Sequence, residues 1–226
     1  MITVHHLEDS RSLRILWLLE ELGVKYEIKS YPRDKDLLAP SSLRAIHPLG
    51  KSPVITDGDK VIAESGAIVD YLMSTYGDGR LSPPPGTPER LRYTYWIHYA
   101  DASAMPALQL QLVFTVLPIR APWLARPLVG AIAGMARKSF VDPQVMLHAN
   151  FWESELGRSP WFAGEEFTAA DAQMSFPLEA AVAWSGIGSK LPRTTEFLGR
   201  IHSRPAYARA LERTGHHNLA SFVSRP

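Results

Sequence analysis

A short segment rich in proline and glycine, residues 78–88, divides this chain of 226 residues into two parts of different character. The segment holds four prolines and two glycines, and such a run cannot continue a helix or a central strand. At its end, Thr87, Pro88 and Glu89 are typical of a helix start, because proline is tolerated in the first turn. We therefore expect two domains, at residues 1–80 and 87–226, a division that suits the chain length.

The first 30 residues have the pattern of a strand, a helix and a second strand. Residues 2–6 predict a strand, and residues 13–19 place apolar side chains at helical spacing before Gly23, which is expected to end the helix. Residues 26–29 predict the second strand. A strand, helix and strand of this length form a βαβ unit with parallel strands and a right-handed crossover.

A hairpin and a helix are expected next. Residues 53–56 and 60–63 flank Asp57-Gly58, a sequence typical of a tight hairpin turn. A helix is expected to begin at Ser65 and to end at residue 77. The first domain therefore has the predicted order βαβ followed by ββα.

The second part of the chain has the pattern of an all-helical domain. Beyond the helix that begins near Pro88, further helix starts are expected at residues 142–143, 168–171, 192 and 203–205. These starts predict five or six helices and no convincing strand. Thr168 and Asp171 have the spacing of a capping box, which we interpret as structural. The fold class expected is α/β followed by all-α.

Charge and composition exclude several classes of function. The chain has 24 basic and 23 acidic residues, interleaved along its length, so no broad nucleic-acid surface is indicated. It has no cysteine, which excludes disulfides, thiolate metal sites and any mechanism that uses a thiol of the protein. The pairs His5-His6 and His216-His217 lack the spacing of metal ligands, so no metal is expected. If thiol chemistry occurs, a ligand must bring the sulfur.

The sequence also bears on location. The N-terminus lacks the order of basic, apolar and small residues found in a secretory signal, so we expect a cytoplasmic protein. The most apolar region, residues 108–135, is interrupted by Pro118, Pro122 and Pro127. It therefore offers no uninterrupted apolar stretch near the roughly 20 residues that a membrane span needs, and no span is expected.

Ser10 and Ser12 lie where the first strand turns into the first helix. The free N–H groups and the partial positive charge of a helix start favour a bound anion. A hydroxyl at this point could donate to the thiolate of a ligand, and a lowered thiol pKa makes sulfur a nucleophile at neutral pH. The alternative is that one of these serines only caps the helix.

Two further turns could hold a ligand. Pro53 begins a predicted strand, and a cis Ser52–Pro53 bond would expose the backbone of Ser52 to an extended ligand, although an ordinary turn proline is the alternative. Glu64 and Ser65 lie where the hairpin meets the next helix. The carboxylate could hold an ammonium group and the hydroxyl a carboxylate, as an α-amino acid requires. The alternative is a capped helix start beside a solvated glutamate.

Taken together, these residues resemble the glutathione S-transferase family, and the resemblance runs over the whole chain. Its most specific parts, in family order and spacing, are residues 10–23 (SRSLRILWLLEELG), 47–53 (HPLGKSP), 62–72 (IAESGAIVDYL) and 167–171 (FTAAD). The family implies a thioredoxin-like N-terminal domain, an all-helical C-terminal domain, a two-fold homodimer, and glutathione as co-substrate. Residues 114–118 resemble a bacterial and fungal subgroup.

Individual roles follow from the resemblance. It implies that the thiol is activated by Ser10, or in reserve by Ser12, which makes the chain similar to the serine-type members. It also implies a small apolar electrophile bound between the domains against Tyr95 and Tyr99. The residues that it implies for binding glutathione are His47, Lys51, Ser52, Pro53, Glu64, Ser65 and Asp101.

Two other classes of function remain open on sequence alone. Some relatives keep the fold only for dimerisation or for binding a partner, but the intact glutathione-binding set argues against such a module here. The same thiolate could also serve as a glutathione-dependent peroxidase, isomerase or dehalogenase. The sequence does not separate these reactions from conjugation of the kind used in detoxification.

Overall fold

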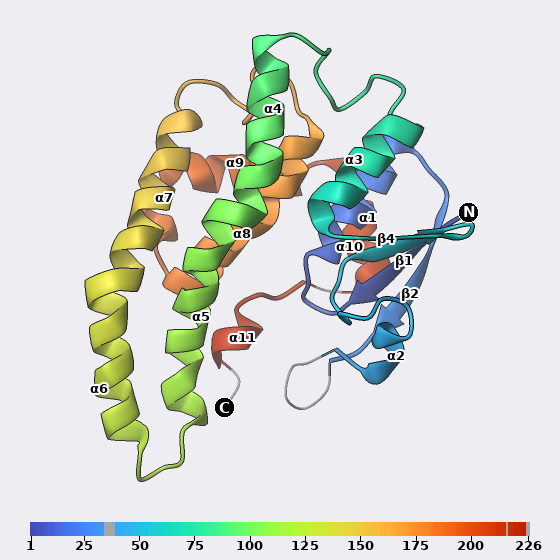
Figure 1. The fold of residues 1–226 in the computed structure, drawn as a ribbon. Helices are drawn as coiled ribbons and strands as arrows, with labels where there is room; N and C mark the ends of the chain where they lie inside the picture. Colours follow the sequence, from blue (N-terminus) through green and yellow to red (C-terminus); the bar gives the residue numbers. More distant parts are fainter. Residues whose placement is uncertain (34–38, 216, 225–226) are drawn as a thin grey trace.

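The computed structural model describes residues 1–33, 39–215 and 217–224, and its first part is a four-stranded sheet with helices packed against it (Figure 1). The strands lie in the order β2-β1-β3-β4. β1 pairs with β2 in parallel, whereas the β1–β3 and β3–β4 pairs are antiparallel. The elements are β1 (Ile2–Leu7), α1 (Ser12–Leu22), β2 (Tyr26–Tyr31), α2 (Ser41–Arg44), β3 (Val54–Asp57), β4 (Lys60–Ala63) and α3 (Ser65–Tyr76).

This arrangement confirms the predicted order βαβ followed by ββα, and with it the thioredoxin-like sheet. The short helix α2 was not predicted, because its four residues are too few to show a helical period. Gly23 ends α1 in the left-handed conformation, with φ 68°, as its position indicates. Arg11 occupies the cap position of α1 and makes no cap hydrogen bond, but the Ser10 hydroxyl accepts from the backbone N–H of Ser12, the first residue of the helix, at 3.2 Å.

Helix α1 is the centre of the molecule. Its side chains are buried on every side, because the sheet covers one face and the C-terminal helices α8 (Ala169–Ser185) and α10 (Pro205–Thr214) cover the other. Trp17, which is fully buried, contacts the rings of Phe167 and Tyr207, each at 5.2 Å between centroids. The two parts of the chain therefore share one apolar core across α1.

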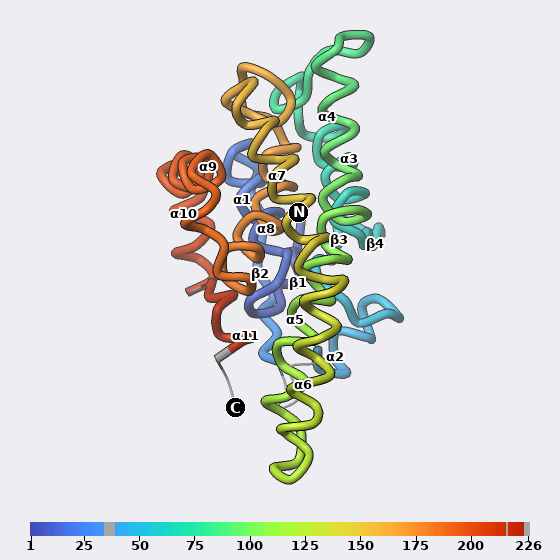
Figure 2. Tube along the Cα trace, turned by 90° about the vertical axis from the view of Figure 1, so that its left-hand side faces the viewer, coloured from blue at the N-terminus to red at the C-terminus, as the bar shows by residue number. Residues whose placement is uncertain are grey.

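Among the residues described, the second part contains helices and connecting turns but no strand, as predicted. The expectation of five or six helices is wrong, because the structure describes eight α-helices there, some joined by irregular turns. Figure 2 shows α9 and α10 on the side of the molecule opposite α3 and α4. The remaining helices are α4 (Pro88–Tyr99), α5 (Met105–Arg120), α6 (Arg126–Ala136), α7 (Asp142–Glu155), α9 (Pro192–His202) and α11 (Ser221–Ser224).

Several predicted helix starts are confirmed in detail. Thr87 caps α4 by accepting a hydrogen bond from the backbone N–H of Arg90 at 3.2 Å. Thr168 and Asp171 form the predicted capping box at the start of α8. The buried Asp171 carboxylate also accepts from the backbone N–H of Phe162 at 2.8 Å, so it joins α8 to the loop before it.

A π-helical stretch, Ala100–Ala104, joins α4 to α5, so one continuous helix runs from Pro88 to Arg120. It contains a window of 18 residues with a mean hydropathy of 1.5, of which 22% is buried, and by length and composition alone it could cross a membrane. Pro118 lies inside α5 without ending it, so this proline does not interrupt the helix as expected. The same helix contributes Trp96 and Met105 to the core.

Candidate active site

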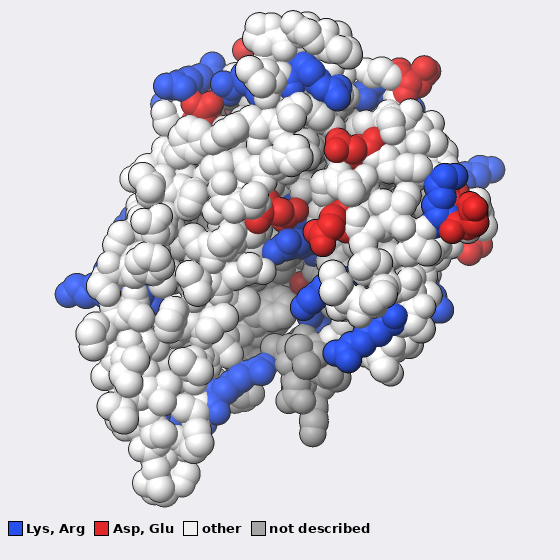
Figure 3. Space-filling view, in the orientation of Figure 1, with Lys and Arg blue, Asp and Glu red and all other residues white. Residues whose placement is uncertain are grey.

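A cavity of about 470 Å³ opens where the sheet meets α5, α8 and the C-terminal segment. In Figure 3, acidic and basic side chains gather near the middle of the face, between the two parts of the molecule. The cavity brings together most of the residues predicted from sequence: Ser10, His47, Lys51, Ser52, Pro53, Glu64 and Ser65. Ser12, Tyr95, Tyr99 and Asp101 do not line it.

Ser10 is placed at the cavity by the turn between β1 and α1. Asp9, just before it, has a positive φ of 48°, a conformation that only a minority of residues other than glycine adopt. The C-terminal segment holds this turn, because Asp9 accepts from the backbone N–H of Asn218 at 2.8 Å and from the Ser221 hydroxyl at 3.3 Å. These two hydrogen bonds could not be predicted from local sequence patterns, since more than 200 residues separate the partners.

The hydroxyl of Ser10 belongs to a cluster of hydroxyl groups. Its Oγ lies 2.7 Å from Oγ of Ser12 and 3.3 Å from Oγ of Ser52. Ser52 in turn donates to the backbone carbonyl of His5 at 3.1 Å. The Ser52–Pro53 peptide bond is cis, which is one of the two alternatives that the sequence left open. Ser10 and Ser52 line the cavity, whereas Ser12 lies behind them and is fully buried.

Glu64 and Ser65 form a second polar point of the cavity. Glu64 has a positive φ of 70° just before α3, and strained backbone of this kind costs about 1–3 kcal/mol and clusters at functional sites. Ser65 does not merely cap the helix, because its hydroxyl accepts from Nη2 of Arg14 at 3.1 Å. Its own proton therefore remains available to donate to an anion.

Arg14 is a site residue that the sequence analysis did not single out. It is 2% exposed, and its guanidinium lies 3.1 Å from Oδ1 of Asp101 and 2.5 Å from the carbonyl of Gln173. Asp101, in the π-helical stretch, also pairs with Arg11 at 3.0 Å and accepts from the Gln173 amide at 2.8 Å. The π-helical turn that carries Asp101 has no signal in the sequence, although such turns often occur at functional sites.

The charges of this network shift each other's pKa values. Burial lowers the pKa of Arg14, and the neighbouring carboxylate of Asp101 opposes that shift. Burial alone would raise the pKa of Asp101, but the positive charges of Arg14 and Arg11 outweigh it and hold this pKa below its usual value. The carboxylate is therefore ionised at neutral pH and compensates the buried guanidinium.

The apolar wall of the cavity comes from elements that the sequence did not indicate. It consists of Met105 and Leu112 on α5, Phe176 and Trp184 on α8, and Phe222 on α11. Phe176 also covers the buried cations, with its ring centroid 5.6 Å from the Arg14 guanidinium carbon. This wall lines the same cavity as Ser10.

Tyr95 and Tyr99, which were predicted to lie against the electrophile, do not line the cavity that holds Ser10. Their rings stack on each other at 5.5 Å between centroids, and they pack toward α7, where Phe151 lies 6.4 Å from Tyr95. The Tyr99 hydroxyl is bonded to Nδ1 of His148 at 2.6 Å. Aromatic residues at helical spacing show that a helix face is covered, but not by which neighbour, and here it faces away from the cavity.

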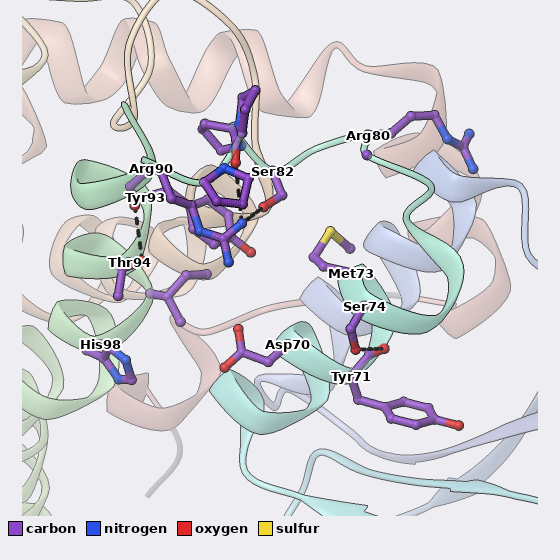
Figure 4. Close-up of a pocket in the computed structure, with 15 residues that line it drawn as sticks. Asp70, Tyr71, Met73, Ser74, Arg80, Ser82, Arg90, Tyr93, Thr94 and His98 are labelled. Carbon is purple, nitrogen blue, oxygen red and sulfur yellow. Dashed lines mark hydrogen bonds between the residues drawn. The ribbon is translucent and has the colours of Figure 1, made fainter. Parts of the chain in front are cut away.

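A second cavity, of about 730 Å³, lies between α3, the proline-rich segment and α4 (Figure 4). It contains Asp70, Arg90 and His98 but none of the residues of the first cavity. Among the residues described, no three histidine, aspartate or glutamate side chains form a group that could hold a metal ion. His216, one of the histidines considered above, lies outside the described residues. The polar side chains that line the first cavity include the hydroxyl groups of Ser10, Ser52 and Ser65 and the charged groups of Lys51 and Glu64.

Comparison with known proteins agrees with this geometry. Residues 1–74 match the family model of the glutathione S-transferase N-terminal domain. Glutathione S-transferase 3 of Schizosaccharomyces pombe is 34% identical, over 98% of this chain and 91% of that protein. Glutathione S-transferase 1 of Saccharomyces cerevisiae is 29% identical, over 94% and 95%. A crystal structure of a glutathione S-transferase from Actinobacillus pleuropneumoniae is 33% identical with a TM-score of 0.78, covering 100% of this chain and 97% of that one. The chain therefore belongs to the glutathione S-transferase family.

Proposed function

We propose that this protein is a serine-type glutathione transferase, which ionises the thiol of bound glutathione and transfers it to a small apolar electrophile. The observation that carries the proposal is the position of Ser10, whose hydroxyl lines the cavity at the start of α1 and beside the apolar wall. A distant structural neighbour, 22% identical, is described as a glutathione S-transferase complexed with glutathione. The residues of this cavity suit the same co-substrate.

The energy required is within reach of one hydroxyl. A thiol with a pKa near 8.5 must fall by roughly two units to be mostly ionised at pH 7, which corresponds to about 2.7 kcal/mol. A hydrogen bond to a charged group contributes about 1.5–3 kcal/mol and the helix N-terminus about 0.3–1 kcal/mol. Ser10 therefore acts as a donor to sulfur and not as a nucleophile.

The rest of the cavity matches the polar groups of glutathione. Ser65 and the N-terminus of α3 would hold the glutamyl carboxylate, and Glu64 the ammonium group beside it. Lys51, with His47 near it, would hold the glycyl carboxylate at the other end, and the backbone of Ser52 before Pro53 the cysteinyl portion between them. Asp101 contributes indirectly, because it fixes the Arg14 guanidinium that donates to Ser65.

Ser65→Ala is expected to weaken glutathione binding while sparing the chemical step. The variant loses a hydrogen bond to a charged carboxylate, so KM for glutathione should rise about tenfold, with kcat within about twofold. Steady-state kinetics with varied glutathione would measure both constants. A fall in kcat with an unchanged KM would remove Ser65 from the glutamyl position.

Leu112→Ala is expected to weaken binding of the electrophile alone. Truncating this side chain of the apolar wall removes up to about 1.5–3 kcal/mol of apolar contact, so KM for an apolar aryl halide should rise about tenfold, with KM for glutathione unchanged. Tyr95→Ala is the matched control, because Tyr95 lies outside the cavity and should leave both constants unchanged. If Tyr95→Ala instead raised KM for the aryl halide and Leu112→Ala left it unchanged, the electrophile would bind against Tyr95 and not against the apolar wall.

We further propose a homodimer of cytoplasmic location that acts in detoxification. Leu91 on α4 and Leu147 on α7 are exposed apolar side chains, and Figure 3 shows few charged side chains over α5, α6 and α7. Exposed apolar side chains of this kind suit contact with a second copy of the chain. Sedimentation equilibrium should give twice the mass of the chain, and a monomer at micromolar concentration would refute the dimer.

Conjugation itself is tested by mixing the purified protein with glutathione and an aryl halide and following the thioether product. Formation of the thioether above the uncatalysed rate is expected. A chain that binds glutathione but forms no product with a range of alkyl, aryl and peroxide substrates would instead be a binding module. Turnover of peroxides alone would assign the peroxidase reaction.

A further inference from the structure

Consecutive hydrogen bonds connect three side chains in a line that runs from the interior of the protein to the Ser10 hydroxyl. Nδ1 of His6 lies 2.8 Å from Oγ of Ser12, and Oγ of Ser12 lies 2.7 Å from Oγ of Ser10. His6 is on β1, 3% exposed, and Ser12 is in the first turn of α1 and fully buried. Of the three, only Ser10 lines the cavity. None of the roles described above uses His6 or explains the burial of Ser12.

The direction of this line, meaning which group donates in each hydrogen bond, is limited by the number of protons, because each hydroxyl has only one to donate. If Nδ1 of His6 accepts, Ser12 donates to it, and the contact between the two hydroxyl groups must then be donated by Ser10. Ser10 would point its proton inward and present only lone pairs to the cavity. Lone pairs would repel a thiolate.

The opposite direction leaves the proton of the Ser10 hydroxyl pointing toward the cavity, where it can be donated to a thiolate. If Nδ1–H of His6 donates to Ser12, the proton of Ser12 is free to be donated to Ser10. Ser10 then accepts from two donors, because the backbone N–H of Ser12 also lies 3.2 Å from its Oγ. Its single proton points outward, where it meets Oγ of Ser52 in a long contact of 3.3 Å that an incoming sulfur can replace.

We propose that His6 is a positioning residue for thiol activation. Its Nδ1–H donates to Ser12 and so directs the proton of Ser10 toward the sulfur of glutathione. The inference rests on the proposed function, since it concerns the same Ser10 donor. It also accounts for Ser12, which sequence reasoning held in reserve as the activating residue: Ser12 lies between the histidine and the catalytic hydroxyl, out of contact with the ligand.

The test uses the thiolate absorbance of bound glutathione, titrated with pH in the full-length protein. His6→Leu removes the donor, so the pKa of the bound thiol should rise by about one unit, which is a tenfold loss of thiolate below that pKa. His6→Asn is the matched variant, because an amide N–H can replace Nδ1–H, and it should keep the wild-type thiol pKa. At a pH no higher than the wild-type pKa of the bound thiol, KM for glutathione should stay within about twofold in both variants, since at least half of the bound thiol is then neutral in each protein.

Ser12→Ala gives a second test whose sign depends on the direction of the line. If the line runs outward, the variant loses a donor to Ser10 and the thiol pKa rises. If it runs inward, the variant frees the proton of Ser10 and the thiol pKa falls, which would overturn the proposal even if the His6 variants fail to fold. A wild-type thiol pKa in both His6→Leu and Ser12→Ala would also overturn it, because a purely structural histidine changes thermal stability alone. An unshifted thiol in the wild-type protein would instead refute the proposed function.

Discussion

Ser10→Ala is expected to reduce kcat about 10- to 100-fold while KM for glutathione changes less than about twofold. The variant loses one hydrogen bond to a charged sulfur, about 1.5–3 kcal/mol, and each 1.36 kcal/mol corresponds to a factor of ten in rate. The bond is formed with the thiolate and not with the neutral thiol, so its loss falls on activation and not on binding. Steady-state kinetics at pH 6.5 would measure the effect where the ionised fraction matters most.

Ser10→Thr is the control for this prediction, because it keeps a hydroxyl at the same position. It should retain most of the activity, and the rate of the alanine variant should approach that of wild type at high pH, where free thiol ionises without help. Equal losses in kcat and in glutathione affinity would show that Ser10 only holds the ligand. Full activity in the alanine variant would show that another hydrogen-bond donor activates the thiol.

The largest effect on stability is expected from Asp101→Asn. Asp101 is the carboxylate nearest to Arg14, whose side chain is 1% exposed, and removing one partner of a buried ion pair costs about 3–5 kcal/mol. The asparagine amide keeps the shape of the side chain and can still accept a hydrogen bond, so the loss of stability measures the contribution of the negative charge. Urea unfolding followed by tryptophan fluorescence would measure the free energy of unfolding. Glu27→Gln, at an exposed position on β2, should stay within about 0.5 kcal/mol of wild type.

The same pair predicts a dependence on pH. The folded pKa of Asp101 lies below its ordinary value of 3.8, so the stabilisation it provides is present above that value and is lost as the pH falls through the lowered pKa. The difference in unfolding free energy between wild type and Asp101→Asn should therefore be constant near neutral pH and shrink in acid. A difference that does not change with pH would assign the effect to packing instead of charge.

The sequence predicted the order of strands and helices in the first part of the chain and most of the polar side of the cavity, because those features depend on local patterns. Gly23 and Thr87 mark helix boundaries within a few residues of the elements they bound, and Glu64-Ser65 lies in one short motif. Arg14 and Asp101 could not be paired in this way, because they are 87 residues apart and belong to different parts of the chain. Their pairing depends on how the C-terminal helices pack against α1.

The residues of the apolar side of the cavity could not be predicted from the sequence, because they too are brought together by the packing of helices that lie far apart in the chain. Helix α8 is buried on nearly all sides, so its hydrophobic pattern does not indicate that Phe176 and Trp184 face the cavity. Helix α4 carries a dense aromatic cluster, and the prediction placed Tyr95 and Tyr99 of this cluster against the electrophile. Neither residue lines the cavity. A face of a helix can be recognised from periodicity, but its neighbour is fixed only by the tertiary fold.

The measurement that tests the central claim most directly is the pKa of the glutathione thiol when bound to the wild-type protein. Thiolate absorbance is titrated with pH, and a parallel titration with S-methylglutathione removes the background of tyrosine and tryptophan. Because the chain has no cysteine, the remaining signal belongs to the ligand alone. The account predicts a bound thiol pKa about two units below the free value near 8.5. Binding with an unshifted thiol pKa would contradict it and leave Ser10 without a catalytic role.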